Sequence, residues 1–292
     1  MGSVLTTIVL PVALGIIMLG LGLSLTLSDF ARVGRHPRAV VIALVVQLLL
    51  LPAICFALVV AFQLPPLLAV GMILLAASPG GTTANLYSHL FGGDIALNIS
   101  LTAINSIIAV VTLPLLTNLA FAVFQAEDRS LGIQFSKAVE VFAIVLLPVA
   151  LGMLVRWWKP AFAARMDKPV RITSIVILAV VIVGAVVSNR DVLLANFAQL
   201  ALITVLFCAI SLTIGYVVPR LLRIERAQAI ASSFEIGIHN ATLAIVIAQT
   251  VIGSVEMSLP AAVYGVLMFF IAGAFGFVIS RIGRRQTAES AP

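Results

Sequence analysis

The chain has 292 residues, of which 62% are hydrophobic and only 10% carry a charge, and its mean hydropathy is +1.22. This composition excludes an ordinary soluble globular domain and is typical of an integral membrane protein. The net charge of +6 does not indicate a nucleic-acid partner, because the basic residues fall in short clusters between apolar segments, where membrane orientation explains them. We therefore expect the lipid bilayer as a partner and no nucleic acid.

Apolar segments of membrane-spanning length follow one another along the whole chain. A helix needs roughly 20 apolar residues to cross the hydrocarbon core. The alternating pattern of a membrane barrel is missing, so the sequence predicts an all-α integral membrane protein with nine transmembrane helices. The expected spans are residues 4–27, 38–62, 66–90, 95–124, 138–156, 171–188, 196–219, 227–251 and 259–280.

Lys and Arg residues are distributed unevenly over the loops between these spans. All of the 17 except Arg129, Lys137 and Arg190 fall on one side of the membrane when nine spans are counted. Because basic loops stay in the cytoplasm, we expect a cytoplasmic C-terminus and an N-terminus outside. The expected location is the inner or plasma membrane.

Two of the spans contain helix-breaking residues within an otherwise apolar stretch. These residues are Pro79, Gly80 and Gly81 in span 66–90, and Gly237 in span 227–251. The two spans run in opposite directions and take equivalent places if spans 1–4 pair with spans 6–9. That relation is typical of inverted repeats whose broken helices meet near the membrane midplane. We expect a first repeat of four helices over residues 1–124 and a second of five over residues 125–292, with span 5 unpaired.

Glu235 is the only acidic residue placed deep within an expected span. A carboxylate is costly at the centre of a bilayer unless it is protonated, paired or bound to a cation. No Lys or Arg lies deep in a span, so the available partners are a cation from solution, a proton, or His239 four residues later. The alternatives are a neutral Glu235 hydrogen-bonded within the bundle and a His239 that only packs there.

Polar residues of spans 2, 3 and 4 add oxygen ligands for a cation. Hard cations such as Na⁺ bind amide, hydroxyl, carboxylate and carbonyl oxygens, and a broken helix frees backbone carbonyls. The side chains concerned are Gln47, Asn85, Asn98 and Thr102. Each of them could instead be a hydrogen-bonding contact between membrane helices.

The break at residues 79–81 precedes a new half-helix, and Asn240 marks a matching break in the other span. The N–H groups and the positive dipole end of a half-helix favour an anionic group of a substrate, although a simple kink is the alternative. No lysine of an ATP-binding loop follows the glycines, so ATP-driven transport within this chain is excluded.

A catalytic metal held by His89, His239 and Glu235 is the enzymatic alternative. The HExxH spacing of zinc proteases is absent, and so is a second acid deep in a span for an aspartyl-type pair. We therefore expect no enzyme, no cofactor, and no metal ion other than Na⁺.

At these residues the chain resembles the bile acid:sodium symporter family. The similar segments, in matching order and spacing, are GIIMLGLGLSLTLSDF (15–30), HPRAVVIALVVQLLLLP (36–52), SPGGTTANLYSHLFGGDIALNISLTAINS (78–106) and FEIGIHNATLA (234–244). The resemblance covers nearly the whole chain. It implies a core domain of spans 2–4 and 7–9, in which the two broken helices cross, and a panel domain of spans 1, 5 and 6. It also implies a nine-helix form that lacks the first helix of the ten-helix bacterial members.

The resemblance further implies two sodium sites that share Glu235. The first site maps onto Asn85, Asn98, Thr102 and Glu235, together with a position that is usually serine and is Ala84 here. The second maps onto Gln47, Glu235, the backbone at Ile236 and Ile238, and His239, a position where glutamine is common. The lost hydroxyl at Ala84 and the titratable group at His239 leave open how many ions are coupled.

The resemblance places substrate binding beside the crossover, with Thr82, Thr83 and Asn240 as the candidate residues. We expect a secondary active transporter that uses Na⁺ to drive uptake of an organic anion by alternating access. The anion is either bile-acid-like or a smaller monocarboxylate such as pantoate or pyruvate. The alternatives are a proton-coupled transporter using Glu235 and His239, and a passive channel or membrane sensor. The sequence favours no single anion and no oligomeric state.

Overall fold

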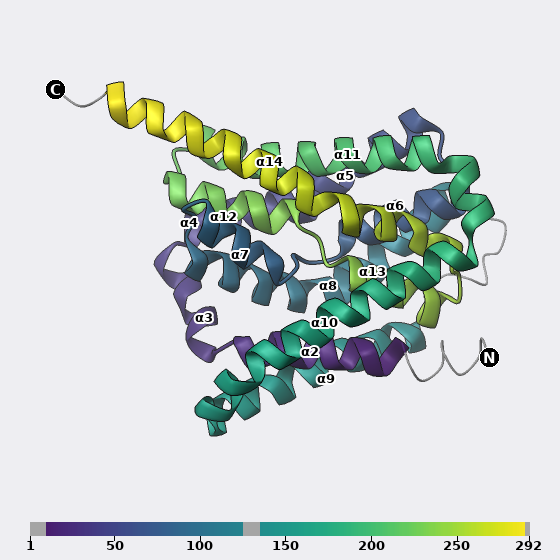
Figure 1. The fold of residues 1–292 in the computed structure, drawn as a ribbon, viewed down its shortest axis with the longest axis horizontal. Coiled ribbons are helices and arrows are strands. Elements are labelled where there is room, and N and C mark those ends of the chain that lie inside the picture. The colour runs from purple at the N-terminus through teal and green to yellow at the C-terminus, as the bar shows by residue number, and fades with distance from the viewer. Residues whose placement is uncertain (1–9, 125–134, 290–292) are drawn as a thin grey trace.

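The structure is a computed structural model, and it describes residues 10–124 and 135–289 (Figure 1). These residues are almost entirely helical, and the one β-bridge among them joins Gly80 to His239. The first residues of the expected span 4–27 lie outside the described part of the chain, as does Arg129.

The helices follow the expected apolar segments, but two of them are much longer than expected: the helix at 171–188 begins at Pro160, and the helix at 259–280 continues to Glu289. Up to residue 124 they are α2 (Leu10–Ser24), α3 (Leu27–Arg32), η2 (Val33–Arg35), α4 (Pro37–Val45), the π-helical turn η3 (Val46–Leu50), α5 (Leu51–Phe62), α6 (Pro66–Ala77), α7 (Thr83–Leu90) and α8 (Ile95–Phe124). From residue 135 they are α9 (Phe135–Trp158), α10 (Pro160–Ser188), α11 (Arg190–Leu221), α12 (Arg226–Gly237), α13 (Ala241–Val246), the π-helical η5 (Ile247–Ile252), η6 (Glu256–Ser258) and α14 (Leu259–Glu289).

Four helical stretches in the described residues are long and apolar enough to cross a membrane. They are Pro37–Phe62, Ile95–Phe124, Arg190–Leu221 and Glu256–Arg281. Many of their outward side chains are apolar, including Val111, which is 69% exposed, as expected where lipid covers the surface. The chain is therefore a multi-pass helical membrane protein.

Helices α2, α9 and α10 pack against one another and form a group along one edge of the molecule (Figure 1). Two glycines let α2 and α9 approach closely. A Cβ atom at Gly152 would overlap the carbonyl oxygen of Leu19, and one at Gly22 would overlap that of Val149. Small residues at such contacts allow membrane helices to gain van der Waals packing where no hydrophobic driving force acts between them.

The remaining helices surround the two broken spans. Helix α12 packs against α11, α8 and α7, while α6 packs against α8. In Figure 1 the short α7 and α13 lie toward the middle of the bundle, between longer helices. This arrangement places the polar residues of both breaks far from either end of the long helices.

The first break follows from Pro79. A proline disfavours helical backbone in the residue before it, and Ser78 is accordingly extended, with φ −72° and ψ 145°. Helix α6 therefore ends at Ala77, and α7 begins only at Thr83.

The second break begins one residue later than the sequence indicated. Gly237 is the last residue of α12, and the chain leaves the helix at Ile238. A Cβ atom at Gly237 would overlap the side chain of Leu212, so this glycine serves the close contact between α12 and α11. Helix α13 then starts at Ala241, and its first turn is capped by the Asn240 side chain, which accepts from the Leu243 N–H at 3.0 Å.

The two breaks pair with each other. The Gly81 N–H donates to the Ile238 carbonyl oxygen at 2.7 Å, and the Asn240 N–H donates to the Pro79 carbonyl oxygen at 2.9 Å. Each break frees backbone groups that have no helical partner, and buried backbone groups need one. The short antiparallel pairing therefore fixes how the two broken spans cross.

The α2–α9 contact gives a test of this packing. We expect Gly152→Ala to lower the free energy of unfolding by about 1–3 kcal/mol, because its new methyl group meets backbone atoms that cannot rotate away. The matched control is Gly184→Ala in α10, which has nothing within 4 Å of its Cβ position. Thermal unfolding of the purified variants in detergent measures both, and equal melting temperatures would contradict the close contact.

Candidate functional site

Glu235 is fully buried at the centre of the site. Its carboxylate is held by two neutral groups from α8: the Thr102 hydroxyl donates to Oε2 at 2.5 Å, and the Asn105 amide donates to Oε1 at 3.2 Å. Among the described residues no Lys or Arg forms an ion pair with Glu235. The site therefore contains an acid for which the protein supplies hydrogen bonds but no opposite charge.

The Asn98 side chain directs its amide oxygen into this buried region without a donor. Its Nδ2 donates to the Ser88 hydroxyl and to the Ala231 carbonyl oxygen, each at 2.8 Å. Since a carbonyl oxygen only accepts, the amide NH₂ must face it, which leaves Oδ1 buried and without a partner. The Asn85 Oδ1 atom is also buried without a partner.

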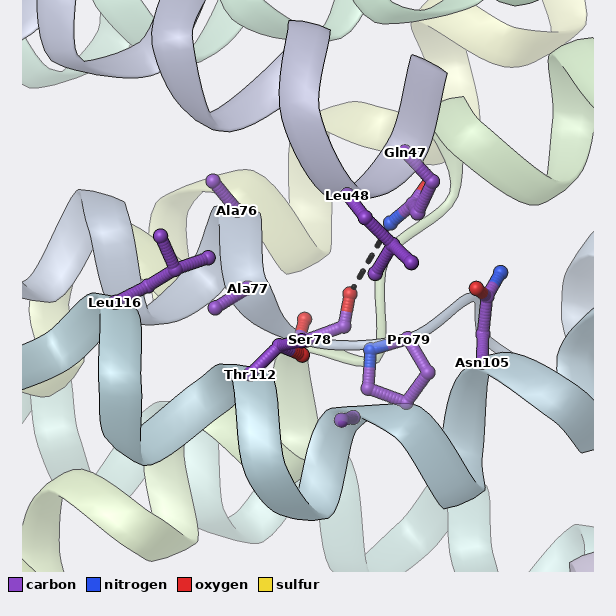
Figure 2. A pocket seen from close by; sticks show the side chains of 10 residues that line it. Gln47, Leu48, Ala76, Ala77, Ser78, Pro79, Asn105, Thr112 and Leu116 are labelled. Carbon is purple, nitrogen blue, oxygen red and sulfur yellow. Dashed lines mark hydrogen bonds between the residues drawn. The ribbon is translucent and has the colours of Figure 1, made fainter. Parts of the chain in front are cut away.

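Gln47 resembles Asn98 on the other side of the crossover, because its amide NH₂ faces an oxygen while its amide oxygen has no partner. It lies in the π-helical turn η3, a local widening that is frequent at functional sites. Its Nε2 faces the Ser78 carbonyl oxygen at 3.4 Å, and its Oε1 is buried without a donor (Figure 2). Gln47 therefore also offers an oxygen to whatever binds here.

His239 is 1% exposed and is held between two aromatic rings. It stacks on Phe207 at a centroid distance of 5.6 Å and meets Tyr264 edge-on at 5.5 Å. Its Nδ1 lies 3.2 Å from the Ser78 carbonyl oxygen, so Nδ1 carries the hydrogen and a neutral ring leaves the Nε2 lone pair free. Nε2 is indeed buried without a hydrogen-bond partner.

His239 and Glu235 are not joined by a hydrogen bond in the described part of the chain. The four-residue spacing would place them on one face of a continuous helix. Helix α12 ends at Gly237, however, and the non-helical backbone at Ile238 carries His239 to Ser78 instead. The contact between the acid and the imidazole that an unbroken helix predicts is therefore absent.

The end of α12 also exposes backbone oxygens. The helical donor for the Ile236 carbonyl would be the Asn240 N–H, which donates to Pro79 instead. The Ile238 carbonyl accepts from Gly81 and keeps a second lone pair. Both carbonyls lie within three residues of Glu235 in the chain and keep lone pairs that no backbone hydrogen bond occupies.

The buried site is thus lined by acceptors. Carboxylate, amide and backbone oxygens are the ligands that hard cations prefer, so the donor set fits Na⁺. Thr82, Thr83 and Asn240 lie at the edge of this region, because they are exposed or partly exposed while Gly80 and Gly81 are buried.

Ala84 is fully buried and brings no hydroxyl. The Asn98 amide hydrogen-bonds Ser88, which lies one turn further along α7 on the same side as Ala84. His89, in contrast, is exposed at the end of α7, away from His239 and Glu235. The described residues contain no group of three His, Cys, Asp or Glu side chains that could hold a metal ion.

Asn105 is not among the predicted site residues, although its amide contacts Glu235 directly. It lies three residues after Thr102 and seven after Asn98, which puts all three on one face of α8. This spacing is visible in the sequence and could have identified Asn105 as a candidate site residue. Ser78 was also missed, because its role depends on its backbone oxygen, which accepts from Gln47 and lies beside His239.

Comparisons with known proteins agree with these chemical features. Residues 11–196 match the model of the sodium bile acid symporter family. The sodium-dependent transporter YocS of Bacillus subtilis is 30% identical over 88% of this chain and 78% of its own length. The probable chloroplastic sodium/metabolite cotransporter BASS1 of Arabidopsis thaliana is 30% identical over 95% of this chain and 67% of its own length. For BASS2 of rice the identity is 28%, over 90% of this chain and 62% of the relative.

The match to the family model covers more than half of the chain, and YocS and BASS1 each align along most of it. This is a family of transporters, not of enzymes. The chain belongs to the sodium bile acid symporter family.

Proposed function

We propose that this protein is a secondary active transporter that uses inward movement of Na⁺ to drive the uptake of an organic anion by alternating access. The observation that carries the proposal is the fully buried Glu235, which has no basic partner among the described residues and is hydrogen-bonded by Asn105, whose own amide oxygen is unpaired. A buried charge without a partner is strongly destabilising, and a bound cation removes that cost.

Glu235 is proposed to serve two ion positions. On one side the ligands are Asn85, Asn98, Thr102 and Glu235, and on the other they are Gln47, Glu235, the carbonyls of Ile236 and Ile238, and His239. Unpartnered amide oxygens at Asn85, Asn98 and Gln47 support both positions. His239 contributes a nitrogen lone pair, a weaker ligand for Na⁺ than oxygen.

The substrate is proposed to bind at the partly exposed side of the crossover, against Thr82, Thr83 and Asn240. Helices α7 and α13 begin here, so their first N–H groups favour an anionic group. An organic anion of the bile-acid type or a smaller monocarboxylate such as pantoate or pyruvate fits this chemistry. The relatives named as sodium/metabolite cotransporters support a small-molecule substrate.

The architecture proposed for transport has nine spans in an inverted repeat, over residues 1–124 and 125–292. The panel consists of the packed helices α2, α9 and α10, and the core contains the two broken spans. Movement of the core against the panel would expose the crossover to each side in turn. The N-terminus is outside and the C-terminus is in the cytoplasm, in the inner or plasma membrane.

The proposal is tested in two steps on the purified protein. A thermal-shift screen against organic acids, each with and without Na⁺, identifies a ligand, because binding to the folded state raises its stability. Uptake of that ligand is then measured in sealed vesicles under an imposed Na⁺ gradient, which should concentrate it. Uptake that persists without Na⁺ and collapses with the proton gradient would establish proton coupling instead. A gradient that never concentrates the ligand would indicate a passive channel or a sensor.

Glu235→Gln tests the central charge. The amide keeps the size of the side chain and removes the charge, so we expect a folded protein that has lost Na⁺-driven uptake. The matched control is Glu225→Gln, at the exposed start of the same helix, which should transport at the native rate. Coupled uptake near the native level in Glu235→Gln would refute the role of the carboxylate.

Gly80→Ala tests whether Na⁺ binding depends on the position of the Glu235 carboxylate. A Cβ atom at Gly80 would overlap the Glu235 carboxyl group, which is the movable end of a side chain, so the fold should persist while the ligand is displaced. We expect the Na⁺ concentration that gives half-maximal thermal stabilisation to rise about 10–100-fold. The neighbouring Gly81→Ala meets its nearest atom, the His239 carbonyl oxygen, at 3.3 Å and should change this concentration less. A native-like response in Gly80→Ala would contradict the geometry.

A further inference from the structure

Asn105 has an oxygen that the hydrogen bonds of the site do not use. The residue is 2% exposed, and its Nδ2 donates to the Glu235 carboxylate at 3.2 Å. Because an ionised carboxylate only accepts, the amide NH₂ must face Glu235, and the orientation of the amide is thereby fixed. The remaining atom, Oδ1, is buried and has no hydrogen-bond partner.

Asn105 lines a small pocket together with Gln47. The pocket is also lined by Ser78 and Pro79 of the first break, and its volume is about 10 Å³, room for about one water-sized sphere. Figure 2 shows Gln47 and Asn105 coming from two different helices toward the Ser78–Pro79 segment. The Gln47 Oε1 is likewise buried without a donor, so the two amides that line this pocket each carry an unpaired oxygen.

The pocket contains no competing donor that could satisfy these oxygens. Its other lining residues are Leu48, Ala76, Ala77, Ala109, Thr112 and Leu116. The only hydroxyl among those six belongs to Thr112, and it donates within α8 to the Ile108 carbonyl oxygen at 3.3 Å. An anion would be repelled by the oxygens and by Glu235, whereas a monovalent cation would be attracted by all three groups.

We propose that Asn105 is a direct oxygen ligand of the cation on the Gln47 side of Glu235, in addition to holding the carboxylate through its NH₂. This inference rests on the proposed Na⁺ coupling and adds a residue to the ligands assigned above. One side chain then joins the acid to the ion that neutralises it: Nδ2 fixes Oε1, and Oδ1 contacts the cation. The position also gains an oxygen where His239 supplies only nitrogen.

The test uses the full-length protein in detergent with Na⁺ alone as the probe. Melting temperatures are measured over a series of NaCl concentrations, with choline chloride keeping the total salt constant. In Asn105→Leu we expect the half-effective Na⁺ concentration to rise about tenfold or more, because a ligand is lost. Its melting temperature in choline chloride reflects two opposing changes, the loss of an unsatisfied buried oxygen and the loss of the Nδ2 donor to Glu235, so the Na⁺ dependence and not this baseline decides the result.

Two further variants make the result specific. Thr112→Val changes the same pocket but removes a hydroxyl already bonded within its helix, and it should keep the native Na⁺ dependence. Asn105→Ala, a smaller change, should repeat the weakened Na⁺ response if leucine proves too bulky to fold.

The outcomes separate this inference from the function on which it rests. If both Asn105 variants respond to Na⁺ within roughly twofold of the native protein, Asn105 is not a ligand, and a water molecule in the pocket explains its oxygen. A parallel drop in melting temperature in both salts, with the Na⁺ dependence unchanged, would show a purely structural role and also overturn the proposal. A native protein that gains no stability from Na⁺ would remove both the inference and the proposed coupling.

Discussion

The interaction on which the site depends is that between the buried Glu235 carboxylate and the neutral groups around it. Thr102 and Asn105 hold the two carboxylate oxygens, yet neither brings a positive charge. The neighbouring amides of Gln47 and Asn98 direct their NH₂ groups at other oxygens and leave their own oxygens unpaired. Because the unpaired amide oxygens are acceptors and no basic side chain is paired with Glu235, a cation or a proton is the partner that would also neutralise its charge.

The crossover is what allows such a concentration of acceptors to be buried. Pro79 ends α6 by forcing Ser78 into extended backbone, and the freed Pro79 carbonyl accepts from Asn240. That same hydrogen bond takes the helical donor from the Ile236 carbonyl, so one break leaves a carbonyl of the other without its helical partner. Gly80 must lack a side chain because the Glu235 carboxyl group occupies the space where its Cβ would lie. The geometry of the two breaks and the position of the Glu235 carboxylate therefore depend on each other.

Much of this could be predicted from the sequence, because the signals are local. Pro79 specifies a break, and an acid within an apolar span specifies a polar site. The missed or misplaced features depend on contacts between distant segments. The direction of His239 is set by the non-helical backbone at Ile238, which a helical spacing rule cannot anticipate. From the sequence alone, Asn105 cannot be told from an amide that hydrogen-bonds between membrane helices. Only the structure shows that it lies against Glu235.

The same geometry connects ion binding to the proposed substrate position. The Ser78 carbonyl lies within hydrogen-bonding distance of both Gln47 and His239, on either side of the first break. Asn240 ties the second break to Pro79 through its N–H and caps α13 through its side chain. A cation that draws the oxygens of Gln47 and Glu235 together would hold both breaks in one arrangement, with Thr82 and Asn240 at their outer edge. An ion can drive a conformational cycle only if it binds one state more tightly than another, and this crossover is the element whose arrangement its binding would favour.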